Sequence, residues 1–335
     1  MSAFTLGGEL VHYEVLGRGR QVIFVHGWIG SWRYWIPTLQ YLQAKYRVYA
    51  LDLFGFGDSG KNPDRYSLEH QVELLADFQR ELGVPKAAFV GHGLGALVVL
   101  EYTRRYPQNI ARVMLVSLPL FDTGDLDRRV PVRPQAAMGR ALAAGSPLTA
   151  PTVPSASSAA LREALLEAAR ARTDPTAATL ARPPAPIEPA PAEQRPQNPL
   201  QALITDAESM LAKAFKRSEP EYDKLNIDVL KTDGRAIRES VATYDAGRVL
   251  DTLRLLTIPA VVLHGLDDPI IQPPSDAVWN YITADKENLL PVQLPNVRHF
   301  PMLEYDLYAS LLNDFLDAPD VSRLEIKERW RRRTR

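Results

Sequence analysis

Residues 88–95 read Ala-Phe-Val-Gly-His-Gly-Leu-Gly and restrict the fold more than any other part of the sequence. An apolar strand ends at Gly91, a tight turn follows, and an apolar helix continues to about Arg105. Alternating glycines allow a strand-to-helix turn that side chains would obstruct. The pattern is that of a nucleophile elbow, G-x-S-x-G, with Gly93 in the position of the serine.

Alternating glycines also occur in phosphate-binding turns, but this spacing fits them poorly. A dinucleotide-binding fingerprint has the form G-x-G-x-x-G beside the first strand, whereas these glycines alternate strictly and come later. Because glycine has no side chain, no covalent intermediate can form at Gly93. We expect the turn to direct backbone N–H groups and a helix N-terminus toward the space above this residue.

Four other segments carry motifs in or just after expected strands: QVIFVHGW at residues 21–28, LDLFGFGDSG at 51–60, VVLHGLDDPI at 261–270 and PNVRHFPMLE at 295–304. Together with the elbow, these motifs resemble the α/β-hydrolase superfamily, in particular its lid-bearing bacterial branch. The resemblance covers about residues 8–120 and 248–317, with the motifs in the expected order.

The resemblance implies a role for several residues. Backbone N–H groups of Trp28 and Leu94 would form an oxyanion hole, and His299 would be the base. The acid would be Asp268, three residues after a strand-end glycine, with its neighbour at 267 as the alternative. The order elbow, Asp, His agrees with the superfamily. The nucleophile position departs from it, which puts a covalent mechanism in doubt.

Other polar residues near these motifs have structural interpretations. His26 and His92 flank glycines in turns, where backbone groups can satisfy them, and His264 ends a buried strand as a packing residue. Asp52 is expected to bind backbone N–H groups of its own loop. Residues 58–59, Asp and Ser, are interpreted as solvated.

The loop at residues 28–35, WIGSWRYW, is rich in aromatic residues. These side chains either pack the following helix onto the sheet or wall a pocket beside Trp28 that favours an apolar or aromatic ligand. The candidate lining residues of that pocket are His26, Gly27, Trp32, Trp35 and His92.

The composition predicts a globular chain without a general attraction to nucleic acid. The chain has 335 residues, 46% of them hydrophobic, and a net charge of −1. We expect no transmembrane segment, no signal peptide and a cytoplasmic location. Six histidines without cysteines or a metal-binding spacing predict no metal site, and no cofactor is expected.

Alternating strands and helices predict a mostly parallel sheet covered on both faces. Strands are expected at 9–16, 21–26, 46–51, 87–91, 112–117, 260–264 and 291–294, and helices at 68–82 and 305–316. The fold class is α/β, and the resemblance specifies the α/β-hydrolase fold, with residues 1–118 and 248–320 as its core. Ligands of such sheets bind beyond the carboxyl ends of the strands, so Gly93, Trp28, Asp268 and His299 should share one crevice.

Residues 119–247 interrupt the core and resemble a helical cap. Helices are expected at 159–173, 200–216 and 235–244. The Ala/Pro-rich segment 174–200 is interpreted as an extended surface loop, with docking of a protein partner as the alternative. The basic tail 321–335 is interpreted as solvated, with a contact to anionic lipid or nucleic acid as the alternative.

These observations leave three hypotheses for function. The first is a hydrolase-family protein without covalent hydrolase activity that binds a small apolar ligand or a partner. The second is an enzyme that uses the His299–Asp268 dyad without a nucleophile, for water activation, lyase or cofactor-free oxygenase chemistry. The third is an esterase-type hydrolase that carries an engineered Ser→Gly change.

Overall fold

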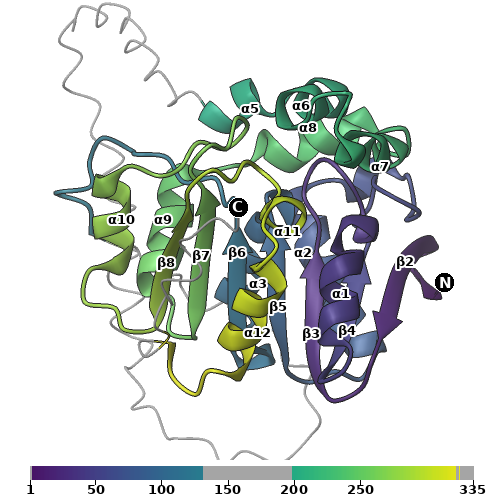
Figure 1. Ribbon diagram of the computed structural model, residues 1–335, viewed down its shortest axis with the longest axis horizontal. Helices are drawn as coiled ribbons and strands as arrows, with labels where there is room; N and C mark the ends of the chain where they lie inside the picture. The colour runs from purple at the N-terminus through teal and green to yellow at the C-terminus, as the bar shows by residue number, and fades with distance from the viewer. Residues whose placement is uncertain (1, 131–197, 322–323, 325–335) are drawn as a thin grey trace, which may run out of the picture. The chain divides into compact units, whose positions relative to one another are not determined.

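The computed structural model describes residues 2–130, 198–321 and 324, which include eight strands in one sheet (Figure 1). The strand order is β1-β2-β4-β3-β5-β6-β7-β8. β1 and β2 pair antiparallel, as do β2 and β4, and every other neighbouring pair is parallel. The strands are β1 (Ser2–Leu6), β2 (Glu9–Leu16), β3 (Arg20–Val25), β4 (Tyr46–Leu51), β5 (Ala87–His92), β6 (Ile110–Val116), β7 (Ala260–Gly265) and β8 (Leu289–Leu294).

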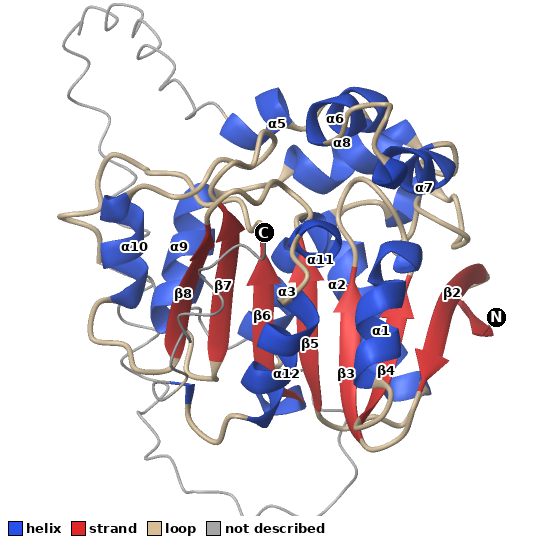
Figure 2. Cartoon of the chain, viewed as in Figure 1, coloured by secondary structure: helices blue, strands red, loops and turns tan. Residues whose placement is uncertain are grey.

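Helices cover both faces of the sheet, and further helices lie beyond its strands (Figure 2). α1 and α12 pack together on one face, while α2, α3, α9 and α10 form a continuous layer on the other. The helices are α1 (Ile36–Leu42), α2 (Leu68–Glu81), α3 (Leu94–Arg105), α5 (Pro199–Leu203), α6 (Ala207–Ala214), α7 (Pro220–Val229), α8 (Gly234–Ala242), α9 (Ala246–Leu255), α10 (Asp276–Thr283), α11 (Pro301–Glu304) and α12 (Tyr308–Asp317), and the short 3-10 helices are η1 (Trp32–Trp35), η2 (Pro63–Arg65) and η3 (Pro107–Asn109).

The central strands form because their side chains are apolar on both faces. Every residue of β5 and β7 is buried, as are the last four residues of β3. Continuous apolar strands of this kind are typical of parallel sheets with helices on both sides. The predicted α/β class and α/β-hydrolase fold are confirmed, although the edge strand β1 was not predicted.

Helices α5 to α8 lie beyond the carboxyl ends of the parallel strands (Figure 2). They belong to the same compact unit as the sheet. The single helix predicted at 200–216 is two helices, because Asp206 accepts the Ser209 N–H and caps α6. α8 agrees with the helix predicted at 235–244, whereas α7 was not predicted.

Several predictions fall outside the described residues. These are the helix at 159–173, nearly all of the Ala/Pro-rich segment 174–200 and nearly all of the basic tail 321–335. The division into core and cap, and a partner for residues 174–200, therefore stay predictions. No helix in the described part of the chain has the length and apolar character needed to cross a lipid bilayer.

Candidate active site

β5 and α3 meet at Gly93, the centre of the expected elbow. Gly93 has φ 51° and ψ −110°, a conformation that residues with side chains adopt only with strain. Its N–H donates to the carbonyl of Val116 at 2.9 Å, and its own carbonyl accepts the N–H groups of Ala96 and Leu97. The turn is thus held to β6 on one side and to the first turn of α3 on the other.

Gly91 and Gly95 are needed for close packing. A Cβ on Gly95 would collide with the backbone carbonyl oxygens of Val25 and His26. A Cβ on Gly91 would lie 2.7 Å from Ala96 Cα, which is too close for two carbon atoms. The start of α3 therefore approaches the end of β3 to a distance that only glycine permits.

The expected oxyanion hole consists of the backbone N–H groups of Trp28 and Leu94. Leu94 opens α3, so its N–H is one of the first-turn donors that a helix cannot pair internally. No hydrogen bond among the described residues uses either N–H. The N–H of Gly27, one residue earlier, donates instead to Tyr34 Oη at 2.7 Å. The oxyanion-hole role stays a prediction.

His299 and Asp268 form a buried pair at the carboxyl end of the sheet. Asp268 Oδ2 accepts His299 Nδ1–H at 2.8 Å, and Oδ1 accepts the N–H groups of Ile270 and Ile271. Burial raises the pKa of Asp268, but the charge and hydrogen bond of His299 and the two N–H donors outweigh it and leave the pKa below its usual value. The alternative acid, Asp267, has an exposed side chain.

The ionised Asp268 fixes the tautomer of its partner. Because a carboxylate can only accept, Nδ1 of His299 carries a proton, and in the neutral imidazole Nε2 then holds the lone pair. The hydrogen bonds of His299 within the described part of the chain use Nδ1 and the main-chain carbonyl. A carboxylate-oriented imidazole with a free lone pair is the arrangement of a general base. Its use as a base stays a prediction.

His92 links Tyr34 to the backbone of His299. Its Nε2–H donates to the His299 carbonyl at 2.9 Å, and its Nδ1 accepts from Tyr34 Oη at 3.0 Å. Burial, followed by the nearby His299, lowers the pKa of His92 well below its ordinary value. His92 is therefore a neutral positioning group with both ring nitrogens in use.

The other pocket candidates are also occupied by contacts within the protein. His26 Nδ1–H donates to the Gly27 carbonyl at 2.7 Å, and its Nε2 accepts the Leu53 N–H at 3.0 Å. Trp35 is fully buried and packs on Phe24 of the sheet. Of the two alternatives for this loop, the structure therefore favours packing for Trp35.

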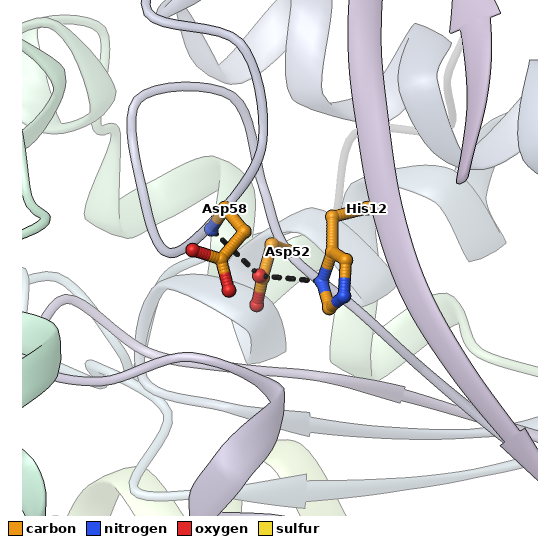
Figure 3. A group of neighbouring side chains, drawn as sticks. All are labelled: His12, Asp52 and Asp58. Atoms are coloured by element: carbon orange, nitrogen blue, oxygen red, sulfur yellow. Dashed lines mark hydrogen bonds and ion pairs between the residues drawn. The ribbon is translucent and has the colours of Figure 1, made fainter. Parts of the chain in front are cut away.

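Trp32 lies beside a polar cluster that the sequence did not predict. Its ring centroid is 6.0 Å from that of His12, and its backbone N–H donates to Asp52 Oδ1 at 2.8 Å. Asp52 Oδ2 accepts His12 Nδ1–H and the Asp58 N–H, each at 2.9 Å (Figure 3). Asp52 thus binds the Asp58 N–H of its own loop, as expected, and also joins this loop after β4 to β2 and η1.

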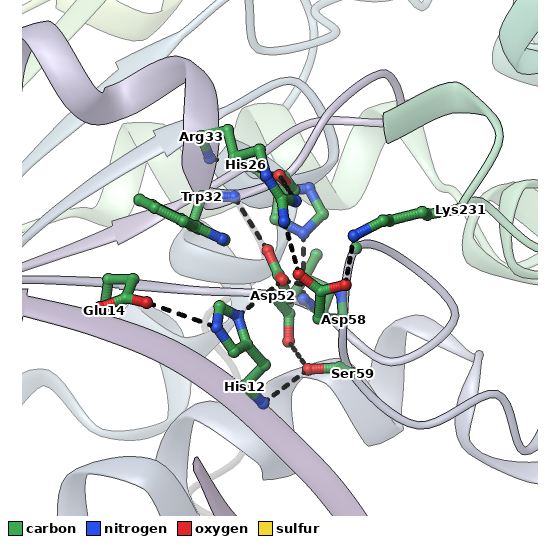
Figure 4. Close-up of polar contacts among 12 residues, drawn as sticks. His12, Glu14, His26, Trp32, Arg33, Asp52, Asp58, Ser59 and Lys231 are labelled. Carbon is green, nitrogen blue, oxygen red and sulfur yellow. Dashed lines mark hydrogen bonds and ion pairs between the residues drawn. The ribbon is translucent and has the colours of Figure 1, made fainter. Parts of the chain in front are cut away.

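Two cations complete this cluster (Figure 4). Asp58 forms ion pairs with Arg33 Nη2 at 2.7 Å and with Lys231 Nζ at 2.5 Å. Arg33 also pairs with Asp228 of α7 at 3.0 Å. The interpretation of residues 58–59 as solvated was wrong, because Asp58 is paired and Ser59 is buried with its hydroxyl donating to the Asp52 carbonyl.

The three residues His12, Asp52 and Asp58 place potential metal-ligand atoms within 4.8 Å of one another. The donor set fits a metal poorly, because Arg33 and Lys231 already neutralise Asp58 and His12 faces the ionisable partner Asp52. The cluster is best described as an ion-pair network that joins α7 and Lys231, two residues beyond it, to two loops of the core.

Several cavities lie away from the elbow, each lined by residues other than Gly93, Trp28, Asp268 and His299. One of about 460 Å³ lies between α3 and α9, with Arg104 on its wall.

Known proteins resemble this chain over different lengths. It is 34% identical over 120 residues to bifunctional epoxide hydrolase 2 of Rattus norvegicus, covering 34% of this chain and 21% of that protein. It is 33% identical over 135 residues to 1-acylglycerol-3-phosphate O-acyltransferase ABHD5 of Homo sapiens, covering 38% of each. The similarity thus spans about a fifth to two fifths of the length of these curated relatives.

Solved structures resemble the fold over almost the whole chain. A hydrolase from Pseudomonas aeruginosa PA01 gives a TM-score of 0.60 at 17% identity, covering 95% of this chain and 98% of that one. A serine-to-glycine mutant of the N-acyl homoserine lactonase AidH, complexed with N-hexanoyl homoserine lactone, gives 0.61 at 19% identity, covering 94% and 96%. The family model described as "alpha/beta hydrolase fold" matches residues 21–306. The chain belongs to the α/β-hydrolase family.

Proposed function

We propose that this α/β-hydrolase-family chain binds a small, largely apolar ligand and does not hydrolyse it through a covalent intermediate. The observation that carries the proposal is Gly93, which occupies the elbow position with φ 51° and has no side chain to attack a substrate. Removal of the nucleophile from a serine-type triad typically lowers kcat by about 10⁶-fold. Binding to the remaining groups survives such a loss.

The groups around Gly93 support binding. The N–H of Leu94 lies at the N-terminus of α3, which favours an electronegative ligand atom such as a carbonyl oxygen. The Trp28 side chain beside it is apolar and almost fully buried. One acceptor oxygen on an otherwise apolar molecule fits this combination.

The test uses the purified chain with a fluorophosphonate probe and with phenyl acetate. We expect no mass adduct after prolonged incubation with the probe, and no hydrolysis of the ester above the rate in buffer. A saturable rise of the melting temperature with phenyl acetate would support binding without turnover. A stoichiometric adduct on a serine would contradict the proposal.

A second candidate function rests on the His299–Asp268 pair. The 2.8 Å hydrogen bond leaves Nε2 of His299 as the proton-accepting atom, so the pair could remove a proton from a bound ligand without a nucleophile. Exchange of the acidic hydrogens of phenylacetone in D₂O, followed by NMR, tests this function. We expect His299→Gln to slow any catalysed exchange by about 10²-fold or more, the usual contribution of a general base.

A further inference from the structure

The indole of Trp28 lies directly over Gly93. A Cβ placed on Gly93 would be 3.2 Å from both Cε3 and Cζ3 of Trp28, closer than most carbon contacts in proteins. Trp28 is 1% exposed, so its ring is enclosed by protein. The volume in which a side chain at residue 93 would act is therefore bordered by this ring.

The polar edge of the same indole is held by a helix beyond the strands. Trp28 Nε1–H donates to Ser240 Oγ of α8 at 3.0 Å. The Ser240 hydroxyl donates its own proton to the Ile237 carbonyl at 2.7 Å, so its oxygen is left as an acceptor. Ser240 is fully buried, and its hydroxyl oxygen is the acceptor at the polar edge of the indole ring.

We propose that Trp28 occupies the ligand position of this site, and that the ligand is a planar aromatic molecule with an N–H or O–H donor. This inference rests on the proposed function, namely that the site binds a small ligand. A ligand enters when the Trp28 side chain turns away from Gly93. It then stacks over the elbow and donates to Ser240 Oγ, as the indole does. Trp28 and Ser240 thereby determine which ligand the site accepts.

The two contacts, at Gly93 and at Ser240, complement each other. Gly93 offers a flat, side-chain-free surface that a planar ring can approach, and Ser240 offers one acceptor at the ring's edge. A buried acceptor that loses its donor costs free energy, so the site favours an occupant with a donor at that edge. An apolar ring without a donor satisfies only the first contact.

The first experiment replaces the internal ring by a free one. In Trp28→Gly, indole should bind in the vacated volume and raise the melting temperature in a saturable way. Benzothiophene, which has the same shape without the N–H, should bind about tenfold more weakly, the usual effect of one buried hydrogen bond. In Trp28→Gly/Ser240→Ala this preference should disappear. Equal affinities in Trp28→Gly, or a preference that persists without Ser240, would overturn the proposal.

A matched control is Trp35→Gly, which removes another fully buried indole whose Nε1 has no hydrogen-bond partner. We expect that variant to show no preference for indole over benzothiophene. If Trp28→Gly folds only when indole is present, the proposal is supported by that dependence. The same preference for indole in both variants would contradict a specific role of Ser240.

A second measurement uses the unaltered site in case Trp28→Gly does not fold at all. In protein labelled with 5-fluorotryptophan, the Trp28 resonance is assigned by its absence in Trp28→Phe. Excess indole should shift this ¹⁹F resonance in a saturable way and leave that of Trp35 unchanged. An unchanged Trp28 resonance would overturn the inference. A fluorophosphonate adduct would instead overturn the proposed function, whatever indole does, so the two failures are distinguishable.

Discussion

Asp268 binds His299 through one carboxylate oxygen and the N–H groups of Ile270 and Ile271 through the other. The carboxylate is therefore fixed by its own backbone before it orients the imidazole. A side chain held in this way keeps its position whether or not the imidazole is used in catalysis. The pair can be tested for stability separately from any test for activity.

Asp268→Asn should lower the free energy of unfolding at pH 7 by about 3 kcal/mol, because it breaks a buried ionic hydrogen bond. The pKa of Asp268 is lowered in the folded protein. Its contribution to stability is therefore present above the unfolded pKa of about 3.9 and is lost as the pH falls through the folded pKa. Urea unfolding at pH 7 and pH 3 should show a difference from wild type that shrinks in acid.

The matched control is Asp267→Asn, because Asp267 is the exposed neighbour. It should change the free energy of unfolding by no more than about 0.5 kcal/mol. Equal losses in the two variants would show that the hydrogen bond to His299 is not what stabilises this loop.

Gly93→Ala and Gly93→Ser should each lower the free energy of unfolding by about 1–3 kcal/mol, since both force a Cβ into the φ 51° turn. Both must also displace Trp28, which lies 3.2 Å from the new Cβ. With the dyad in place, the hydroxyl of the serine variant should react with a fluorophosphonate, whereas the alanine variant should not. Denaturation curves and intact mass measure the two effects. Unchanged stability in both variants would mean that residue 93 is not in a strained turn.

Asp58→Asn should weaken the attachment of the segment after α7 to the core. Burial raises the pKa of Asp58. The hydrogen bonds from Lys231 and Arg33 outweigh this effect and lower the pKa to about 2. Its contribution is thus present above about pH 4 and is lost between about pH 4 and 2. We expect a loss of about 1–2 kcal/mol at pH 7 and, in a double-mutant cycle with Lys231→Met, a coupling of at least about 0.5 kcal/mol. Asp64→Asn, at an exposed residue, is the control.

His264→Leu should reduce the acid sensitivity of folding. Burial lowers the pKa of His264 to about 4, and neither ring nitrogen has a hydrogen-bond partner among the described residues. The unfolded chain binds a proton near pH 6.5 and the folded chain does not, so wild type loses stability as the pH falls from about 6.5 to about 4. Between pH 7 and pH 5 the variant should lose about 2 kcal/mol less than wild type in urea unfolding. Identical losses of stability in the variant and in wild type would contradict a lowered pKa of His264 in the folded protein.

The sequence predicted the elements whose residues are close together in the chain. The central strands are continuous apolar runs, and the elbow glycines lie within five positions of one another, so local pattern is sufficient. The His299–Asp268 contact was also expected, because both residues follow strand ends on one edge of a parallel sheet. Local signals of this kind also account for α2 and α8.

The contacts that the sequence did not predict join distant segments. The network of His12, Asp58 and Lys231 brings together β2, the loop after β4 and the segment after α7. Each residue in isolation resembles an ordinary surface charge, and no spacing along the chain connects them. The sequence predicted that Trp28 and Gly93 share one crevice, but not the hydrogen bond of Trp28 to Ser240, which is 212 residues away.

The packing of Gly95 against the carbonyl oxygens of Val25 and His26 has a consequence for how such sequences are classified. These glycines are required because a helix closely approaches a neighbouring strand. The fold needs this close approach whether or not the chain catalyses a reaction. A search pattern built on them selects proteins able to make the turn and says nothing about reactivity. Assignment of an activity to a new sequence of this kind therefore depends on the identity of one central residue.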